Sequence, residues 1–224
     1  MKAKTATPSP AQVRENVYTR LREEILACAL PPGARIHEQD LVSRYHVGKP
    51  PIRDALLRLQ EQGLVDALPR SGYRIRPISL ADALELYEMR QVLERECVAR
   101  AVEAARDSEL AQLDHYRKVA RNIDLGAWIA YNREFHGAIA AASHNSRLAR
   151  AAADVVEEFD RLTYVSINAA GDARSLQRSV DEHGALIDAI QHRDKRRALV
   201  LLREHIESSR KRTLASISNP PIVP

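Results

Sequence analysis

Four polar side chains in the second half of the chain have the spacing of a metal site. Asn132 and His136 are four residues apart, so both would project from one face of a helix. His183 and His205 are separated by the length of one helix and a short turn, as in two adjacent antiparallel helices. Three imidazoles and one oxygen suit zinc, with nickel or manganese as alternatives, and leave positions open for water or a ligand oxygen. The competing interpretation is that each histidine is a buried residue satisfied by hydrogen bonds.

Arg90 is the other chemical candidate in this half. A guanidinium directed into a helical bundle must be paired, and the carboxylate of a small organic acid bound at the metal would accept two hydrogen bonds from it. An internal pair with Glu94, four residues later, is an equal alternative. The other histidines lack a comparable spacing. We interpret them as surface or capping residues: His37, His46, His115, His144 and His192.

Helices are the elements that would position these side chains. From Ser79 onward, apolar residues recur with helical spacing, and residues that favour helix caps separate the segments. The pattern predicts helices at 79–105, 108–122, 124–142, 145–170, 174–192 and 194–215. Long helices with short loops pack as an antiparallel six-helix bundle, in whose interior side chains from several helices meet. The sequence therefore predicts a mainly α protein.

The first 77 residues differ in charge and pattern from the rest. They contain 13 Lys and Arg against 8 Asp and Glu, whereas the remainder contains 21 against 22. A basic domain beside a near-neutral one favours nucleic-acid binding by the first. A first helix is expected at 13–29. The expected organisation is a disordered N-terminus (1–10), a DNA-binding domain (11–76), a linker (77–78), a helical domain (79–216) and a flexible tail (217–224).

Residues 30–76 have the pattern of a winged helix-turn-helix. Apolar residues predict two short helices around a turn at 46–48: Leu41, Val42 and Tyr45 in the first, and Ile52, Leu56 and Leu59 in the second. Pro50 and Pro51 place the start of the second helix near residue 50, because proline is tolerated only where a backbone N–H has no helical partner. After Gly63 the apolar residues alternate, which predicts a two-stranded β-hairpin whose tip at 70–72 is the wing.

DNA recognition gives the basic residues of this module distinct roles. Side chains at the N-terminal end of a recognition helix reach base edges in the major groove, so Arg53 is the candidate for a bidentate contact with guanine. Lys49 could contact a base or a phosphate. At the wing, Gly72 would allow a close approach to the DNA, and Arg70 and Arg74 add charge. The alternative is that these are solvated basic side chains on a small helical domain.

Several motifs of this part match a known family: Leu30-Pro31-Pro32-Gly33, Glu38 with Leu41, Val47 to Leu59, Gly63-Leu64-Val65 and Arg70-Ser71-Gly72-Tyr73. The segment resembles the GntR family of bacterial transcription regulators. The resemblance implies base or phosphate contacts for Lys49 and Arg53, while Gly48 and Pro50 lack the hydroxyls that the family commonly offers to phosphates. Gln39 stands where a basic residue often assists from the preceding helix. With Arg58 beside the exposed side of the helix, the DNA-contacting candidates are Gln39, Lys49, Arg53, Arg58, Arg70, Gly72 and Arg74.

The helical part carries a second set of motifs: Tyr87-Glu88-Met89-Arg90 with Leu93-Glu94, Asn132 with Phe135-His136, Glu182-His183 and Glu204-His205. These motifs resemble the FCD ligand-sensing domain found in one branch of the GntR family, and the whole resemblance covers about residues 12–215. It implies that His136, His183, His205 and Asn132 bind a metal ion. Asn132 supplies a neutral carbonyl where many relatives carry Asp, which lowers the attraction for a dication.

These patterns predict a DNA-binding transcription regulator, not an enzyme, in which a small carboxylated metabolite binds the bundle and modulates operator binding. A homodimer would present paired recognition helices to a pseudo-palindromic operator in double-stranded DNA. Two alternatives remain open. One is a metal-responsive regulator without an organic effector; the other is a metal-dependent hydrolase, for which no general base stands out.

The remaining composition indicates a cytoplasmic protein. Cys28 and Cys97 stand singly in helical patterns, so neither a disulfide framework nor a thiolate metal site is indicated, and both are expected in the core. No apolar run is long enough to cross a membrane, and the first residues lack the apolar core of a signal peptide.

Overall fold

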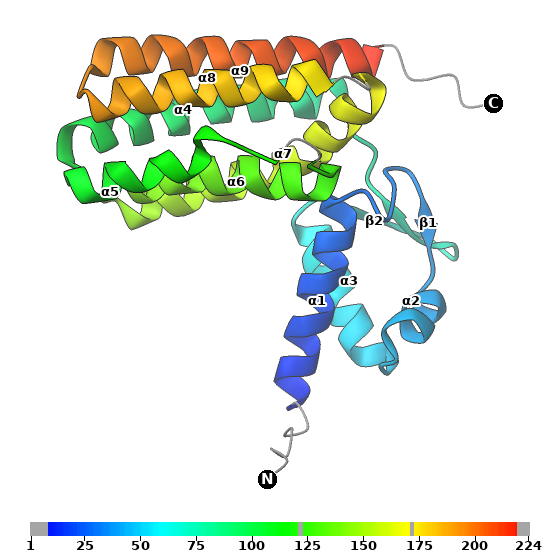
Figure 1. The fold of residues 1–224 in the computed structure, drawn as a ribbon. Coiled ribbons are helices and arrows are strands. Elements are labelled where there is room, and N and C mark those ends of the chain that lie inside the picture. The colour runs from blue at the N-terminus through cyan, green and yellow to red at the C-terminus, as the bar shows by residue number, and fades with distance from the viewer. Residues whose placement is uncertain (1–8, 121–122, 171–172, 219–224) are drawn as a thin grey trace. The chain divides into compact units, whose positions relative to one another are not determined.

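The computed structural model describes residues 9–120, 123–170 and 173–218, and it divides into two compact units between Ile78 and Ser79 (Figure 1). The first unit contains α1 (Pro10–Leu26), β1 (Arg35–Ile36), α2 (Glu38–Tyr45), α3 (Lys49–Glu61), β2 (Val65–Leu68) and β3 (Gly72–Ile75). Its core lies between these elements, and α1 packs against α3. The most deeply buried side chains include Leu21, Ile25, Leu41, Ile52, Leu56, Leu59, Val65 and Ile75.

Helix α1 begins and ends three residues earlier than the sequence pattern predicts. Ser9 starts it with a capping box, because the Ser9 hydroxyl accepts a hydrogen bond from the backbone N–H of Gln12 and the Gln12 side chain accepts one from the backbone N–H of Ser9. Pro10 follows at the first helical position, which suits proline. The prediction of disorder is therefore wrong for residues 9 and 10; residues 1–8 lie outside the described part.

The helix-turn-helix has the predicted order. Helix α2 ends at Tyr45 and is capped by His46, whose φ of +54° is left-handed, and Gly48 precedes α3, which begins at Lys49. The wing has one strand more than predicted, because β1 pairs with β3 in an antiparallel sheet of order β1-β3-β2. Gly72 has φ of +80°, and a Cβ there would lie 2.7 Å from the carbonyl oxygen of Ile36. Pairing of the wing with β1 therefore requires this glycine.

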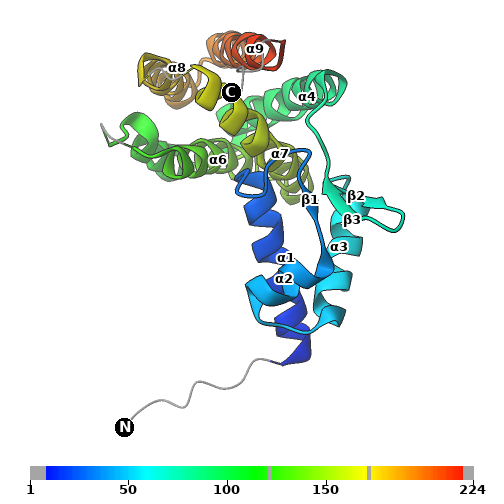
Figure 2. The same ribbon diagram turned by 90° about the vertical axis from the view of Figure 1, so that its right-hand side faces the viewer.

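The second unit is a helical bundle. Its elements are α4 (Leu80–Ala104), α5 (Asp107–Ala111), the 3₁₀ helix η1 (Gln112–Arg117), α6 (Leu125–Ala141), α7 (Ser146–Ala170), α8 (Ala173–Gln191) and α9 (Lys195–Ser218). Helix α4 packs against α6, α7 and α9, and α8 packs against α9 (Figure 2). Among the described residues, no helix is both long and apolar enough to span a membrane.

The predicted helix at 108–122 is the main departure in this unit. It is α-helical only to Ala111 and continues as η1, which ends at Arg117; residues 121 and 122 of the predicted helix lie outside the described residues. In a 3₁₀ turn the side chains at i and i+3 eclipse, and the Arg117 Nε lies 2.6 Å from Oδ1 of Asp114. At the other end of the bundle, α9 continues to Ser218, so residues 217 and 218 are helical, contrary to the predicted flexible tail. The rest of that tail lies outside the described residues.

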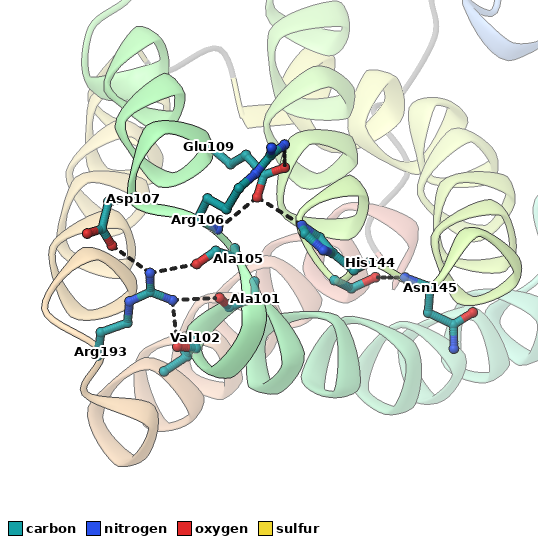
Figure 3. A network of polar contacts seen from close by, with 10 residues as sticks. Ala101, Val102, Ala105, Arg106, Asp107, Glu109, His144, Asn145 and Arg193 are labelled. Carbon is teal, nitrogen blue, oxygen red and sulfur yellow. Dashed lines mark hydrogen bonds and ion pairs between the residues drawn. The ribbon is translucent and has the colours of Figure 1, made fainter.

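An arginine in the turn between α8 and α9 caps the end of α4 (Figure 3). The Arg193 guanidinium donates to the carbonyl oxygens of Val102 and Ala105 at 2.9 and 2.6 Å, and it also lies 2.6 Å from Oδ1 of Asp107. The last carbonyls of a helix lack partners within the helix and carry a partial negative charge, so a cation there stabilises the helix end. This contact holds the α8–α9 turn against α4 and so fixes the three helices relative to one another.

Candidate metal centre and nucleic-acid interface

The recognition helix α3 presents its basic residues at its N-terminal end. Lys49 is the first residue of the helix and is exposed, and the Arg53 side chain is 62% exposed one turn later. Gln39 is exposed in the first turn of α2. Both side chains are therefore exposed at the end of the helix that reaches base edges in this kind of module, and their contacts with DNA stay a prediction.

Glu38 holds Arg53 in position, and this contact between α2 and α3 could not be predicted from the sequence. The Arg53 Nε lies 3.0 and 2.9 Å from the two carboxylate oxygens of Glu38, at the start of α2. Because this contact uses Nε, the two terminal nitrogens of the guanidinium remain available for a base edge. A guanidinium oriented in this way loses less side-chain entropy when it binds guanine.

Arg58 has a role in packing that separates it from the other basic residues. Its guanidinium lies 3.4 Å from the centre of the Tyr18 ring, and its Nη1 lies 2.8 Å from Oε2 of Glu15. Both partners belong to α1, so Arg58 ties α3 to α1. A contact between Arg58 and DNA stays a prediction that this packing does not favour.

The wing keeps part of its predicted charge. Arg70, at the tip of the hairpin, is exposed and has no ion-pair partner in the described part of the chain. Arg74 pairs with Asp66 across the hairpin at 3.0 Å, and that carboxylate also lies 3.3 Å from Arg76. On β1, Arg35 is exposed and lies opposite Arg74 in the sheet. The three-stranded wing therefore adds Arg35 to the candidates, a residue that a two-stranded hairpin would leave out.

The second unit brings the three predicted histidines together. His136 from α6, His183 from α8 and His205 from α9 are all buried, and their candidate ligand atoms lie within 4.8 Å of one another. Their ring centres are 4.7 to 5.4 Å apart. The five other histidines are exposed, as predicted. Helical spacing thus identified three side chains that meet in the interior of the bundle.

A different neighbour faces the Nδ1 atom of each ring. The Tyr131 hydroxyl donates to the carbonyl of Tyr116 at 2.7 Å, so it accepts from Nδ1 of His183 at 3.0 Å. Nδ1 of His205 lies 2.9 Å from Oε2 of Glu182. Nδ1 of His136 lies 2.7 Å from a carboxylate oxygen of Glu94, although the two groups are not well aligned for a hydrogen bond.

These neighbours assign the tautomer of the rings. A carboxylate or an already donating hydroxyl can only accept, so each Nδ1 carries the proton and each Nε2 keeps a lone pair. Nε2 of His183 is buried and has no hydrogen-bond partner among the residues that the structure describes. An orphaned acceptor of this kind costs free energy unless a cation or a donor meets it.

Burial keeps the histidines neutral. It lowers the pKa of His136 from 6.5 to about 4, with Arg90 contributing, and it lowers the pKa values of His183 and His205 as well. Burial raises the pKa of Glu94, but Arg90 and His136 outweigh burial and hold it below the ordinary value. At neutral pH the cluster therefore consists of neutral imidazoles beside an ionised carboxylate, which is the protonation state that binds a metal ion.

Arg90 and Asn132 lie next to this cluster. Arg90 is buried and pairs with Glu94, the internal partner that the sequence left open, and its Nη2 lies 2.6 Å from Nε2 of His136. Asn132 and Arg90 line a cavity of about 40 Å³ that also reaches His205. The structure thus places both predicted residues beside the histidines; whether Asn132 binds a metal remains a prediction.

Comparisons with known proteins agree with this architecture. Residues 13–75 match the bacterial regulatory proteins of the gntR family, and residues 85–208 match the FCD domain. The uncharacterized HTH-type transcriptional regulator BphR of Paraburkholderia xenovorans is 31% identical over 91% of this chain and 88% of its own length. The HTH-type transcriptional repressor RspR of Escherichia coli is 27% identical over 83% of this chain and 82% of its own. The structure of E. coli McbR/YncC shares the fold, with a TM-score of 0.80 at 22% identity over 94% of this chain and 100% of that one.

The matched families and these relatives are transcriptional regulators and not enzymes. The family match covers both units of the chain, and it agrees with the helix-turn-helix and the helical bundle described above. The chain therefore belongs to the GntR family of bacterial regulatory proteins, as a DNA-binding transcription regulator that joins a winged helix-turn-helix to an FCD domain.

Proposed function

We propose that His136, His183 and His205 hold a divalent metal ion, and that a small carboxylated metabolite bound beside it modulates operator binding. The orphaned Nε2 of His183 is the observation that carries this proposal. Histidines that served only the core would each be satisfied by hydrogen bonds, whereas a cation would meet this lone pair.

The donor set fits zinc. Imidazole nitrogens in a tetrahedral zinc site lie about 2.0–2.1 Å from the ion, and hence ~3.4 Å from one another. The ligand atoms here lie within 4.8 Å of one another, so a small inward movement of the rings would complete the site. Nickel and manganese are alternatives, and Asn132 would be a weaker fourth ligand than a carboxylate because it carries no charge. When bound, the metal would supply a positive charge and an open position for an anionic oxygen.

Arg90 supports the carboxylate part of the proposal. Its Nη2 contacts the same nitrogen of His136 that the metal would use, so metal binding would displace the guanidinium from that nitrogen. Glu94 offsets the charge of Arg90, so the charge of a nearby dication would be left without a full counter-charge. A carboxylate would offset the excess positive charge and accept two hydrogen bonds from the guanidinium.

For the DNA-binding half we propose that the protein acts in the cytoplasm as a homodimer on a pseudo-palindromic operator. Two recognition helices related by a two-fold axis read two half-sites, and one half-site alone would bind too weakly against genomic competition. The effector would then act by changing the separation or mobility of the two DNA-reading domains.

The test combines metal analysis with effector titration, using an operator selected from a random DNA library. We expect about one zinc ion per chain after purification, and His183→Ala should lose both the metal and the response to organic acids. Arg90→Ala should keep the metal and lose affinity for the acid. A response to zinc alone would favour a metal-responsive regulator without an organic effector, and a full response to organic acids in metal-free protein would contradict the site.

A further inference from the structure

A second arginine lines the cavity beside the histidines, and it donates hydrogen bonds to two hydroxyl groups. Arg212 of α9 donates from Nη1 to the Ser208 hydroxyl at 2.7 Å and from Nη2 to the Ser179 hydroxyl at 3.3 Å. Within the described part of the chain no carboxylate lies at ion-pair distance. Glu182 is reached only through Ser208, whose hydroxyl donates to Oε1 of Glu182 at 3.2 Å.

The charge on Arg212 is poorly compensated. Burial lowers the pKa of Arg212, and although Glu182 raises it, Arg178 and Arg90 lower it further. Arg90 already has Glu94 as its own partner, and Glu182 already contacts His205 and Arg178. A half-buried guanidinium bound only to hydroxyl groups keeps an unsatisfied preference for an anion.

The cavity joins this arginine to the proposed metal site. Arg212, Arg90 and His205 all line it. The remaining polar lining is formed by Asn132 and by hydroxyl groups: Thr163, Ser166, Ser179, Ser209 and Thr213. Its volume of about 40 Å³ accommodates one or two water molecules, so a ligand there must be short, and Arg90 must move to admit it.

We propose that Arg212 is a second anion anchor and that the effector is a short dicarboxylate, preferably hydroxylated. One carboxylate would bind at Arg90 and the histidine cluster, the other would bind Arg212, and the lining hydroxyls would hydrogen-bond the polar groups between them. This inference rests on the proposed metal and carboxylate function and adds to it the number of acidic groups that the ligand carries.

The experiment compares pairs of ligands that differ by one carboxylate. Malate and 2-hydroxybutyrate form one pair, and succinate and butyrate form the other; each is titrated by calorimetry into zinc-loaded protein. We expect each dicarboxylate to bind about 10- to 100-fold more tightly than its partner, as charge-assisted hydrogen bonds would give. Arg212→Gln should remove this preference and leave the affinities for 2-hydroxybutyrate and butyrate unchanged.

Arg210→Gln is the matched control, because Arg210 lies on the same helix and pairs with Glu207 outside the cavity. It should keep the preference for dicarboxylates. If Arg212→Gln still prefers dicarboxylates, the role of Arg212 is overturned and the proposed function stays intact. The same holds if the wild type shows no preference for dicarboxylates while zinc and the monocarboxylates still bind. A wild-type protein that binds none of zinc, nickel and manganese in separate titrations overturns both.

Discussion

Replacing Tyr131 with Phe removes the single atom that holds His183 in its tautomer. The Tyr131 hydroxyl lies 3.0 Å from Nδ1 of His183 and donates to the carbonyl of Tyr116 at 2.7 Å. Without it, Nδ1 of this fully buried ring would lose its acceptor, and the proton would no longer be confined to Nδ1. Tyr131→Phe should therefore weaken a metal at Nε2 while leaving the three imidazoles in place.

The size of the effect follows from the kind of contact that is lost. Partners that orient a metal-binding histidine typically contribute 10- to 100-fold in metal affinity, which corresponds to about 1.4–2.8 kcal/mol. Competition between the protein and a chromophoric chelator for zinc measures this difference directly. The free energy of unfolding of the zinc-free protein should fall by only about 1 kcal/mol, the usual contribution of one hydrogen bond.

Tyr116→Phe provides the control for this prediction. Tyr116 belongs to the same aromatic cluster, with its ring centre 6.0 Å from that of Tyr131, but it contributes its backbone carbonyl and not its hydroxyl to the contact. Its zinc affinity should stay within a factor of two or so of the wild type, since the carbonyl is kept. Equal zinc affinities for Tyr131→Phe and the wild type would refute the assignment of Nε2 as the ligand atom of His183.

Four further predictions address the operator, the metal and the stability of the fold. Arg53→Ala should weaken binding to a selected operator by about 1–3 kcal/mol and relax the base preference at one operator position. Arg70→Ala should weaken binding to all sequences alike and reduce by about one the slope of the logarithm of the binding constant against the logarithm of the salt concentration. Gel-shift titrations at two salt concentrations measure both effects, and wild-type selectivity of Arg53→Ala would contradict the assignment of α3 as the recognition helix. Asn132→Asp should tighten zinc binding in the chelator competition, because it adds a negative charge beside the histidines; weaker binding would argue against Asn132 as a ligand. Zinc-free protein should lose stability as the pH falls from about 6.5 to about 4, since the unfolded chain takes up a proton on His136 that the folded state excludes. The free energy of unfolding should fall by about 3 kcal/mol over that window because of this histidine. Urea unfolding at a series of pH values measures this loss, and a free energy that stays constant would contradict the prediction. Arg193→Met should lower the free energy of unfolding by about 1–2 kcal/mol, because three carbonyls at the end of α4 lose a hydrogen-bond donor. An unchanged urea denaturation curve would show that water replaces the guanidinium without a loss of stability.

The parts of the fold that could be predicted from sequence are those fixed by local spacing. The apolar period of 3.6 residues and the capping residues located the long helices to within a few residues, and two prolines located the start of α3. Strand β1 could not be found in this way, because two residues are too short to alternate. The 3₁₀ segment η1 was missed because its apolar residues also fit an α-helical period, and the contact of Arg117 with Asp114 is visible only in the structure.

The candidate metal centre also has a part that the sequence predicts and a part that only the structure shows. His136, His183 and His205 could be predicted together because helical register and a helix-plus-turn spacing are properties of the chain order. Their neighbours could not, since Tyr131 and Glu182 meet the rings only through the packing of separate helices.

Cross-helix packing also decides the roles of two arginines. The sequence indicated an exposed Arg58, but its guanidinium packs on Tyr18 of α1. Arg212 could not be predicted as a cavity residue, because nothing in the neighbouring sequence indicates that it lines the cavity.

Anomalous diffraction at the zinc edge, from crystals of the zinc-loaded regulator, tests the central claim most directly. We expect one strong peak within the FCD domain, at about 2.0–2.1 Å from Nε2 of His136, His183 and His205, with each Nδ1 still facing its neighbour and Arg90 withdrawn from His136. Crystals in which these three rings surround no anomalous peak, with Nε2 of His183 satisfied by a water molecule, would contradict the claim.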